Sequence, residues 1–379
     1  MSKVSEAHRT GFPQLNIPPR LLLGPGPSNA HPRVLQALGM RQVGHLDPQF
    51  LEIMNRNQEM IRYVWQTENK MCIPVSGTGS AAMEAAFANL VEPGDRVVVA
   101  VKGYFGLRMV DMAERYGARV IRISKPWGEA FSFSEISGAV QEHRPAIFAI
   151  VHAETSTGVL QELSGVGDLC RENDCLLLAD TVTSMGGVPL FIDDWKIDAA
   201  YSGSQKCLSC PPGISPLTFG SRAMEKIGSR QGKVKNWYLD MSLLGNYWGK
   251  ERSYHHTAPI NMNYGLYEAL RLVEEEGLEK RWERHHENAY LLVSELRRIG
   301  LEPYAPGDIR LPSLITVAVP EGVDARRVTS ALLNKYNIEI GNGLGELAGK
   351  VWRIGLMGFN SRPENVVLVA SALDRILNG

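Results

Sequence analysis

Short apolar runs alternate with amphipathic segments through the middle of the chain. The apolar runs cover residues 71–75, 96–101, 118–123, 146–151, 175–179, 199–202 and 216–219. Between them lie segments such as 82–90, in which apolar positions recur at steps of three and four residues, as on one face of a helix. Continuous apolar strands that alternate with helices are typical of a mostly parallel sheet covered on both faces. We therefore predict an α/β fold whose large domain contains a mostly parallel seven-stranded sheet.

The pattern of apolar and polar residues is different at the two ends of the chain. The first twenty residues are polar and contain three prolines, which predicts an extended arm that lies over a partner subunit. Residues 21–28 (Leu-Leu-Leu-Gly-Pro-Gly-Pro-Ser) combine a short apolar strand with a rigid loop. Beyond residue 260, the pattern predicts long charged helices at 262–276 and 278–299, followed by shorter strands and helices. We predict an arm at 1–20, a large domain at 21–276 and a smaller C-terminal α+β domain at 277–379.

Composition and charge exclude several classes of protein. The chain has 379 residues, and its 40 Lys and Arg against 41 Asp and Glu offer no basic surplus for nucleic acid. Its apolar runs are too short to span a bilayer, and its first residues contain no apolar signal-peptide core. Five cysteines, an odd number in a long chain, do not form a disulfide framework. We expect a cytoplasmic protein without membrane or nucleic-acid partners.

Three polar features follow strands of the predicted sheet. Residues 75–80 (Val-Ser-Gly-Thr-Gly-Ser) join a strand to a helix, whose N-terminal amides favour an anion. Asp180 follows five apolar residues, and Lys206 follows a strand and a turn of small residues. Each has an ordinary alternative: a capped turn, a helix cap and a surface lysine, respectively. Because the carboxyl ends of parallel strands meet at one sheet edge, we expect the three features to lie together.

An anion site, a carboxylate and a lysine amine at one sheet edge are what pyridoxal phosphate requires. The chain also resembles the class V aminotransferases of fold type I over nearly its whole length. The resemblance rests on seven motifs in the family's order, at residues 22–28, 76–80, 154–158, 180–184, 202–206, 254–257 and 351–355. It is closest to the alanine–glyoxylate and serine–glyoxylate (serine–pyruvate) aminotransferases. It implies pyridoxal phosphate as cofactor and a homodimer with shared active sites.

The resemblance also implies a role for individual residues. Lys206 would form the Schiff base and move the α-proton, and Asp180 would hold the pyridine nitrogen protonated. Arg353 would grip the substrate carboxylate with the backbone at Gly26, and Thr155 would lie near the ring oxygen and the substrate. The remaining predicted cofactor contacts, which surround the phosphate or the ring, are Thr78, Gly79, Ser80, Phe105, Val182 and Gln205, with Tyr254 and Thr257 reaching in from the neighbouring subunit. The family often has Trp or Tyr at position 105 and His or Thr at position 80.

Several alternatives remain beside transamination of alanine or serine with glyoxylate. Another class V enzyme, such as a 2-aminoethylphosphonate–pyruvate aminotransferase, is one, and a cysteine desulfurase-like lyase is another. A desulfurase requires a cysteine in the C-terminal domain, whereas all five cysteines precede residue 211. Cys207 and Cys210 form a single C-x2-C pair, so we expect no metal site. The pair His285-His286 lies in a charged helix, and we expect it to be solvated.

Overall fold

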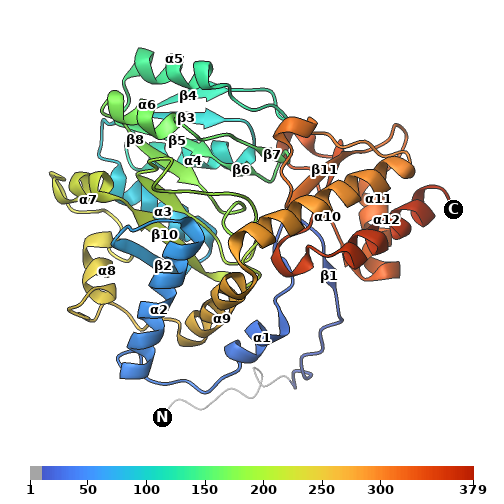
Figure 1. The fold of residues 1–379 in the computed structure, drawn as a ribbon, viewed down its shortest axis with the longest axis horizontal. Helices are drawn as coiled ribbons and strands as arrows, with labels where there is room; N and C mark the ends of the chain where they lie inside the picture. Colours follow the sequence, from blue (N-terminus) through green and yellow to red (C-terminus); the bar gives the residue numbers. More distant parts are fainter. Residues whose placement is uncertain (1–10) are drawn as a thin grey trace, which may run out of the picture.

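A computed structural model describes residues 11–379 of the chain (Figure 1). Residues 1–10, the first half of the predicted arm, lie outside the described residues. Between residues 11 and 379, no helix is both long and apolar enough to cross a bilayer.

A seven-stranded sheet forms the centre of the molecule, as the sequence predicts. In spatial order its strands are β2 (Met71–Gly77), β10 (Gly213–Phe219), β9 (Ala199–Tyr201), β8 (Leu176–Asp180), β5 (Ile147–Val151), β3 (Arg96–Val101) and β4 (Arg119–Ser124). Strand β10 runs antiparallel to β2 and β9, and the other neighbours are parallel. Asp180 pairs with Val151 on one side and with Tyr201 on the other, so the carboxyl ends of three strands meet.

Helices cover both faces of this sheet (Figure 1). Residues of α3 (Gly79–Leu90), α4 (Tyr104–Arg115), α7 (Ser221–Gly228) and α8 (Met241–Trp248) share one apolar core with the sheet. Residues of α5 (Phe133–His143) and α6 (Val166–Glu172) share a second core, and α2 (Pro48–Trp65) and α9 (Ile260–Glu276) contribute to both. Successive residues of β3 enter the two cores in turn, which explains why the strand is apolar throughout. The short α1 (Pro32–Leu38), like α7 and α8, is not predicted from the sequence.

A smaller sheet with its own core follows towards the C-terminus. Its antiparallel strands are β11 (Leu314–Ala318), β14 (Val351–Gly355) and β13 (Gly341–Asn342). The helices that pack with it are α10 (Leu278–Arg298), α11 (Ala325–Tyr336) and α12 (Pro363–Leu377). The N-terminal β1 (Leu21–Leu22) pairs with β12 (Ile338–Glu339), and Leu23 is buried in this same core. The C-terminal part therefore fixes the loop that begins at Gly24, while the division at residue 276 stays a prediction.

Candidate active site

The turn between β2 and α3 provides unpaired amides for an anion. Thr78 occupies the N-cap of α3, but its side chain makes no capping hydrogen bond. The first amides of a helix lack the partner one turn earlier, and those of Gly79 and Ser80 remain available, whereas Ala81 N donates to Thr78 O over 2.7 Å. Arg108 Nη1 donates to Ser80 Oγ over 3.1 Å, which adds a cation beside this turn. The geometry favours the predicted anion site over an ordinary capped turn.

Asp180 is the last residue of β8 and is 3% exposed. Its Oδ1 accepts from Val182 N over 2.9 Å, and its Oδ2 accepts from the hydroxyl of Tyr201 over 3.0 Å. Burial raises the pKa of Asp180 to about 6, because the ionised form loses its hydration. Burial also raises the pKa of Tyr201, so its hydroxyl stays protonated and donates. Asp180 is thus an oriented carboxylate that is suited to a cationic partner.

Lys206 lies in the loop between β9 and β10 and is 7% exposed. Its Nζ donates to Pro25 O, in the loop after β1. Burial, and next the nearby charge of Arg353, lower the pKa of Lys206 to about 8. Gly26 has φ of +111°, and a Cβ there would approach Lys206 Nζ to 2.7 Å. Only glycine allows the two loops to lie this close together.

These residues surround a cavity of about 220 Å³ at the edge where the strands end. Its lining contains most of the residues predicted to contact the cofactor: Gly79, Ser80, Phe105, Thr155, Asp180, Val182, Gln205 and Lys206. The Oε1 atom of Gln205 is buried and has no hydrogen-bond partner among the described residues. An unsatisfied buried oxygen beside free helix amides indicates that a polar ligand belongs here. The residues present therefore fit pyridoxal phosphate.

Arg353 and Thr155 extend the site towards the smaller sheet. Arg353 is on β14 and 6% exposed, and burial lowers the pKa of its guanidinium to about 10. Its Nε donates to Asn342 O over 2.8 Å, and its Nη1 donates to Thr155 O over 3.4 Å. The structure therefore places Arg353 against Thr155, a residue of the cavity wall, while its role as the anchor of the substrate carboxylate stays a prediction.

Tyr254 and Thr257 are not part of the cavity of their own chain. Both are exposed, Tyr254 to 63%. Their loop is held by His256, whose Nε2 lies 2.8 Å from Ser76 Oγ at the end of β2. Both side chains are therefore accessible to another molecule.

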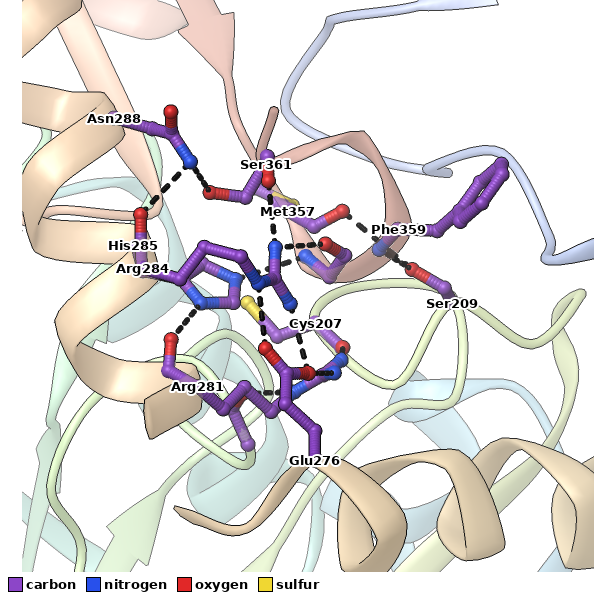
Figure 2. Close-up of polar contacts among 12 residues, drawn as sticks. Cys207, Ser209, Glu276, Arg281, Arg284, His285, Asn288, Met357, Phe359 and Ser361 are labelled. Atoms are coloured by element: carbon purple, nitrogen blue, oxygen red, sulfur yellow. Dashed lines mark hydrogen bonds and ion pairs between the residues drawn. The ribbon is translucent and has the colours of Figure 1, made fainter. Parts of the chain in front are cut away.

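One expectation from the sequence is wrong. His286 is exposed, whereas His285 is fully buried; Figure 2 shows the contacts of His285. The Nδ1 atom of His285 donates to Arg281 O over 2.7 Å, and the Nε2 atom of His285 accepts from Gly358 N over 2.9 Å. His285 faces inward because it lies one turn from the buried Arg281 on α10, a periodicity that the many charges of this helix conceal.

Three residues of the site were missed by sequence reasoning. Tyr201 orients Asp180, and Arg108 lies over the ring of Phe105, 5.0 Å from its centroid. The buried Glu154 accepts from Phe105 N over 3.2 Å, and so joins the start of α4 to the turn that carries Thr155. Glu154 opens the motif at 154–158, and Tyr201 directly precedes the motif at 202–206, so these positions were the available signal.

A lysine amine, a buried carboxylate and an anion site at the edge of such a sheet define a pyridoxal phosphate-dependent enzyme of fold type I. Residues 27–362 match the model of the family described as aminotransferase class-V. The chain belongs to the class V aminotransferases.

Known proteins resemble the chain over most or all of their length. A crystal structure of alanine–glyoxylate aminotransferase from Nostoc sp. is 60% identical, with a TM-score of 0.98 and full coverage of both chains. Ureidoglycine–glyoxylate aminotransferase from Bacillus subtilis is 40% identical, with a TM-score of 0.95 over 96% of this chain and 94% of that one. Alanine–glyoxylate aminotransferase of Callithrix jacchus is 46% identical over 96% of this chain and 89% of its own.

Proposed function

We propose that this aminotransferase moves the amino group of alanine to glyoxylate, which yields pyruvate and glycine. The observation that carries the proposal is the meeting of Lys206, Asp180 and the free amides of α3 in one small cavity beside Arg353. The relatives from Nostoc and Callithrix jacchus are both named for alanine and glyoxylate. A cavity of about 220 Å³ suits small substrates.

The cofactor's position follows from the chemistry of the lining. Its phosphate would be held by Thr78, Gly79, Ser80 and Gln205, with Arg108 adding positive charge from α4. Asp180 would pair with the ring nitrogen, and Val182 and Phe105 would cover the two ring faces. Bound pyridoxal phosphate supplies an electron sink that draws negative charge from the α-carbon of an amino acid.

Lys206 would act both as the amine that binds the cofactor and as the group that moves the substrate's α-proton. A pKa of about 8 leaves an appreciable neutral fraction of Nζ near neutral pH, so this atom can accept and return a proton. Asp180, with a pKa of about 6, remains largely ionised at pH 7 and can keep a proton on the ring nitrogen. The two groups thus divide the proton handling between the α-carbon and the ring.

Arg353 would orient the substrates, with the backbone at Gly26 and Thr155 beside it. A guanidinium offers two parallel donors that match a carboxylate. Alanine and glyoxylate each carry one carboxylate, so a single clamp serves both half-reactions. Arg353 would therefore determine where the α-carbon lies relative to Lys206.

We further propose that the enzyme is a homodimer in which Tyr254 and Thr257 reach the partner's phosphate site. Their exposure supports this, as do the arm's apolar side chains Phe12, Leu15 and Ile17, which are 70–86% exposed. Mixed dimers of Lys206→Ala with Tyr254→Phe/Thr257→Ala would contain one intact site. They should recover activity, and exchanged mixtures no more active than their parents would contradict the shared site. A cytoplasmic location remains a prediction.

The decisive experiment is a panel of amino donors and oxo-acid acceptors on the purified enzyme. We expect the highest kcat/KM with alanine and glyoxylate. Serine, (S)-ureidoglycine and 2-aminoethylphosphonate test the other donors, and pyruvate tests the other acceptor. Activity only with another pair would overturn the substrate assignment.

A second measurement tests the chemistry itself. Borohydride reduction of the loaded enzyme should attach the cofactor to Lys206, and Lys206→Ala should give no such adduct. A desulfurase role is disfavoured because all five cysteines are buried, and burial raises the pKa of Cys72 to about 12.

A further inference from the structure

Arg281, on the first turn of α10, lies behind the loop that carries Lys206 (Figure 2). Its side chain is 6% exposed, and each of its three guanidinium nitrogens has a hydrogen-bond partner. Nη2 donates to Cys207 O over 2.6 Å, and Nε donates to Gly186 O over 2.8 Å. Nη1 forms an ion pair with Glu276 over 2.6 Å. The same guanidinium therefore binds both the residue after Lys206 and the loop that follows Asp180.

Neutral side chains make the other links between the two bridged loops. The loop of residues 202–212 forms no strand; its Cys207 Sγ donates to Thr183 O over 3.2 Å, and its Ser202 Oγ donates to Thr181 O over 3.2 Å. A thiol is a weak donor, whereas a guanidinium presents several donors in a fixed plane. Beside these neutral links, Arg281 adds a charged one that contacts both the loop of Lys206 and that of Asp180.

We propose that Arg281 is a positioning residue, which fixes the amine of Lys206 relative to the carboxylate of Asp180 by clamping Cys207 O and Gly186 O with one guanidinium. The proposal rests on the proposed function, in which Lys206 is the cofactor-binding amine. Arg281 does not line the cavity, so it acts through the two loops rather than on the reactants.

Arg284 provides a matched control on the same helix. It forms an ion pair with the same carboxylate, with Nε 2.5 Å and Nη2 2.9 Å from the Glu276 oxygens, and it donates to Gly358 O and Ser361 O. Arg284 touches neither Cys207 nor Gly186. Replacing either arginine leaves Glu276 paired with the other, so Arg281→Met and Arg284→Met remove the same charge from one cluster.

Two forms of the cofactor distinguish a displaced Lys206 amine from a general loss of the cofactor site. The aldehyde of pyridoxal phosphate condenses with the Lys206 amine and releases one water, whereas pyridoxamine phosphate has no aldehyde and cannot react. We would measure the Kd of both forms on the cofactor-free variants by fluorescence, together with their thermal unfolding. For Arg281→Met we expect the Kd of pyridoxal phosphate to rise about tenfold and that of pyridoxamine phosphate less than about threefold, because only the first depends on the amine's position.

The controls make each outcome decisive. Arg284→Met should lower the unfolding temperature as much as Arg281→Met does, but it should change both Kd values less than about threefold. Arg281→Lys should behave like Arg281→Met, because lysine lacks the planar fork of the guanidinium. For Arg281→Met, kcat with alanine should fall about 100-fold while KM changes little, since a shift of about 1 Å has that effect.

An unchanged ratio of the two Kd values in Arg281→Met, or an equal change in Arg284→Met, would overturn the proposal. Peptide mapping of the borohydride adduct on the wild-type enzyme keeps the two hypotheses apart. If the adduct is not on Lys206, the proposed function fails; if it is on Lys206 and the ratio is unchanged, only the role of Arg281 fails.

Discussion

The hydroxyl of Tyr201 is one of two donors that hold the Asp180 carboxylate, and Tyr201→Phe removes it with little change in shape. The hydroxyl binds Oδ2 over 3.0 Å, while Val182 N binds Oδ1 over 2.9 Å and is unaffected by the change. Both side chains are buried, so no water replaces the lost donor freely. The ionised form of Asp180 loses one hydrogen bond, whereas its protonated form loses little.

The size of the effect follows from these contacts. A hydrogen bond to a charged group contributes about 1.5–3 kcal/mol, and one pKa unit corresponds to about 1.4 kcal/mol. The pKa of Asp180 is about 6 in the cofactor-free chain, and it should rise by about 1–2 units in Tyr201→Phe. Near pH 7, a substantial fraction of the variant would then carry a neutral Asp180 that cannot pair with a cationic ring.

Carbon-13 NMR of the aspartate carboxyl groups measures this pKa directly in the cofactor-free chain. The spectrum of Asp180→Asn identifies the signal by its absence. Cofactor affinity should fall in parallel, most strongly below the new pKa. The lost hydrogen bond should shift the titration midpoint of Asp180 by about 1 unit or more. A midpoint in Tyr201→Phe within about 0.3 unit of the wild-type midpoint would refute the reasoning.

Three further changes test the rest of the site. Arg353→Lys should raise KM for alanine and for glyoxylate alike, by the equivalent of about 2–5 kcal/mol, because both carboxylates lose the same fork; an effect on one substrate alone would exclude a shared anchor. Arg108→Gln should weaken pyridoxal phosphate about tenfold but not phosphate-free pyridoxal, and equal losses would assign Arg108 to the ring of Phe105 instead. Burial, and next the charge of Arg281, lower the pKa of His285 to about 3, below its unfolded value of about 6.5. The stability that neutral His285 contributes is therefore lost as the pH falls below 6.5. Between pH 7 and pH 5, the free energy of urea unfolding of the wild type should fall by about 2 kcal/mol more than that of His285→Gln. Equal pH dependence of the two proteins would contradict this.

The sequence predicts the sheet well because its central strands, such as β5 and β8, are continuous apolar runs between two covering layers. The same logic places Asp180, which directly follows such a run, and Lys206, which follows one after a short turn, because the carboxyl ends of parallel strands converge. The expected partners of the phosphate depend on a local turn, which the glycines at 77 and 79 mark. These features are local in sequence, so a pattern can reveal them.

What the sequence does not reveal depends on contacts between distant segments. Tyr201 belongs to an apolar strand, and only the pairing of β8 with β9 turns its hydroxyl into a donor for Asp180. Arg281 and His285 lie in a helix rich in charged residues, where the pattern gives no reason to expect full burial. Their inward position follows from the packing of α10 against the loop of Lys206.

Burial acts in opposite directions on the two groups that would bind the cofactor. It raises the pKa of Asp180 to about 6 and lowers that of Lys206 to about 8, so each is less stable in its charged form than in water. The amides of Gly79 and Ser80, at the start of α3, are likewise left without partners among the described residues. A ligand with a ring nitrogen, an aldehyde and a phosphate supplies a partner for the carboxylate, the amine and these amides at once. Cofactor binding should therefore relieve unfavourable interactions that the fold builds into this cavity, which makes cofactor affinity and chain stability two measures of the same site.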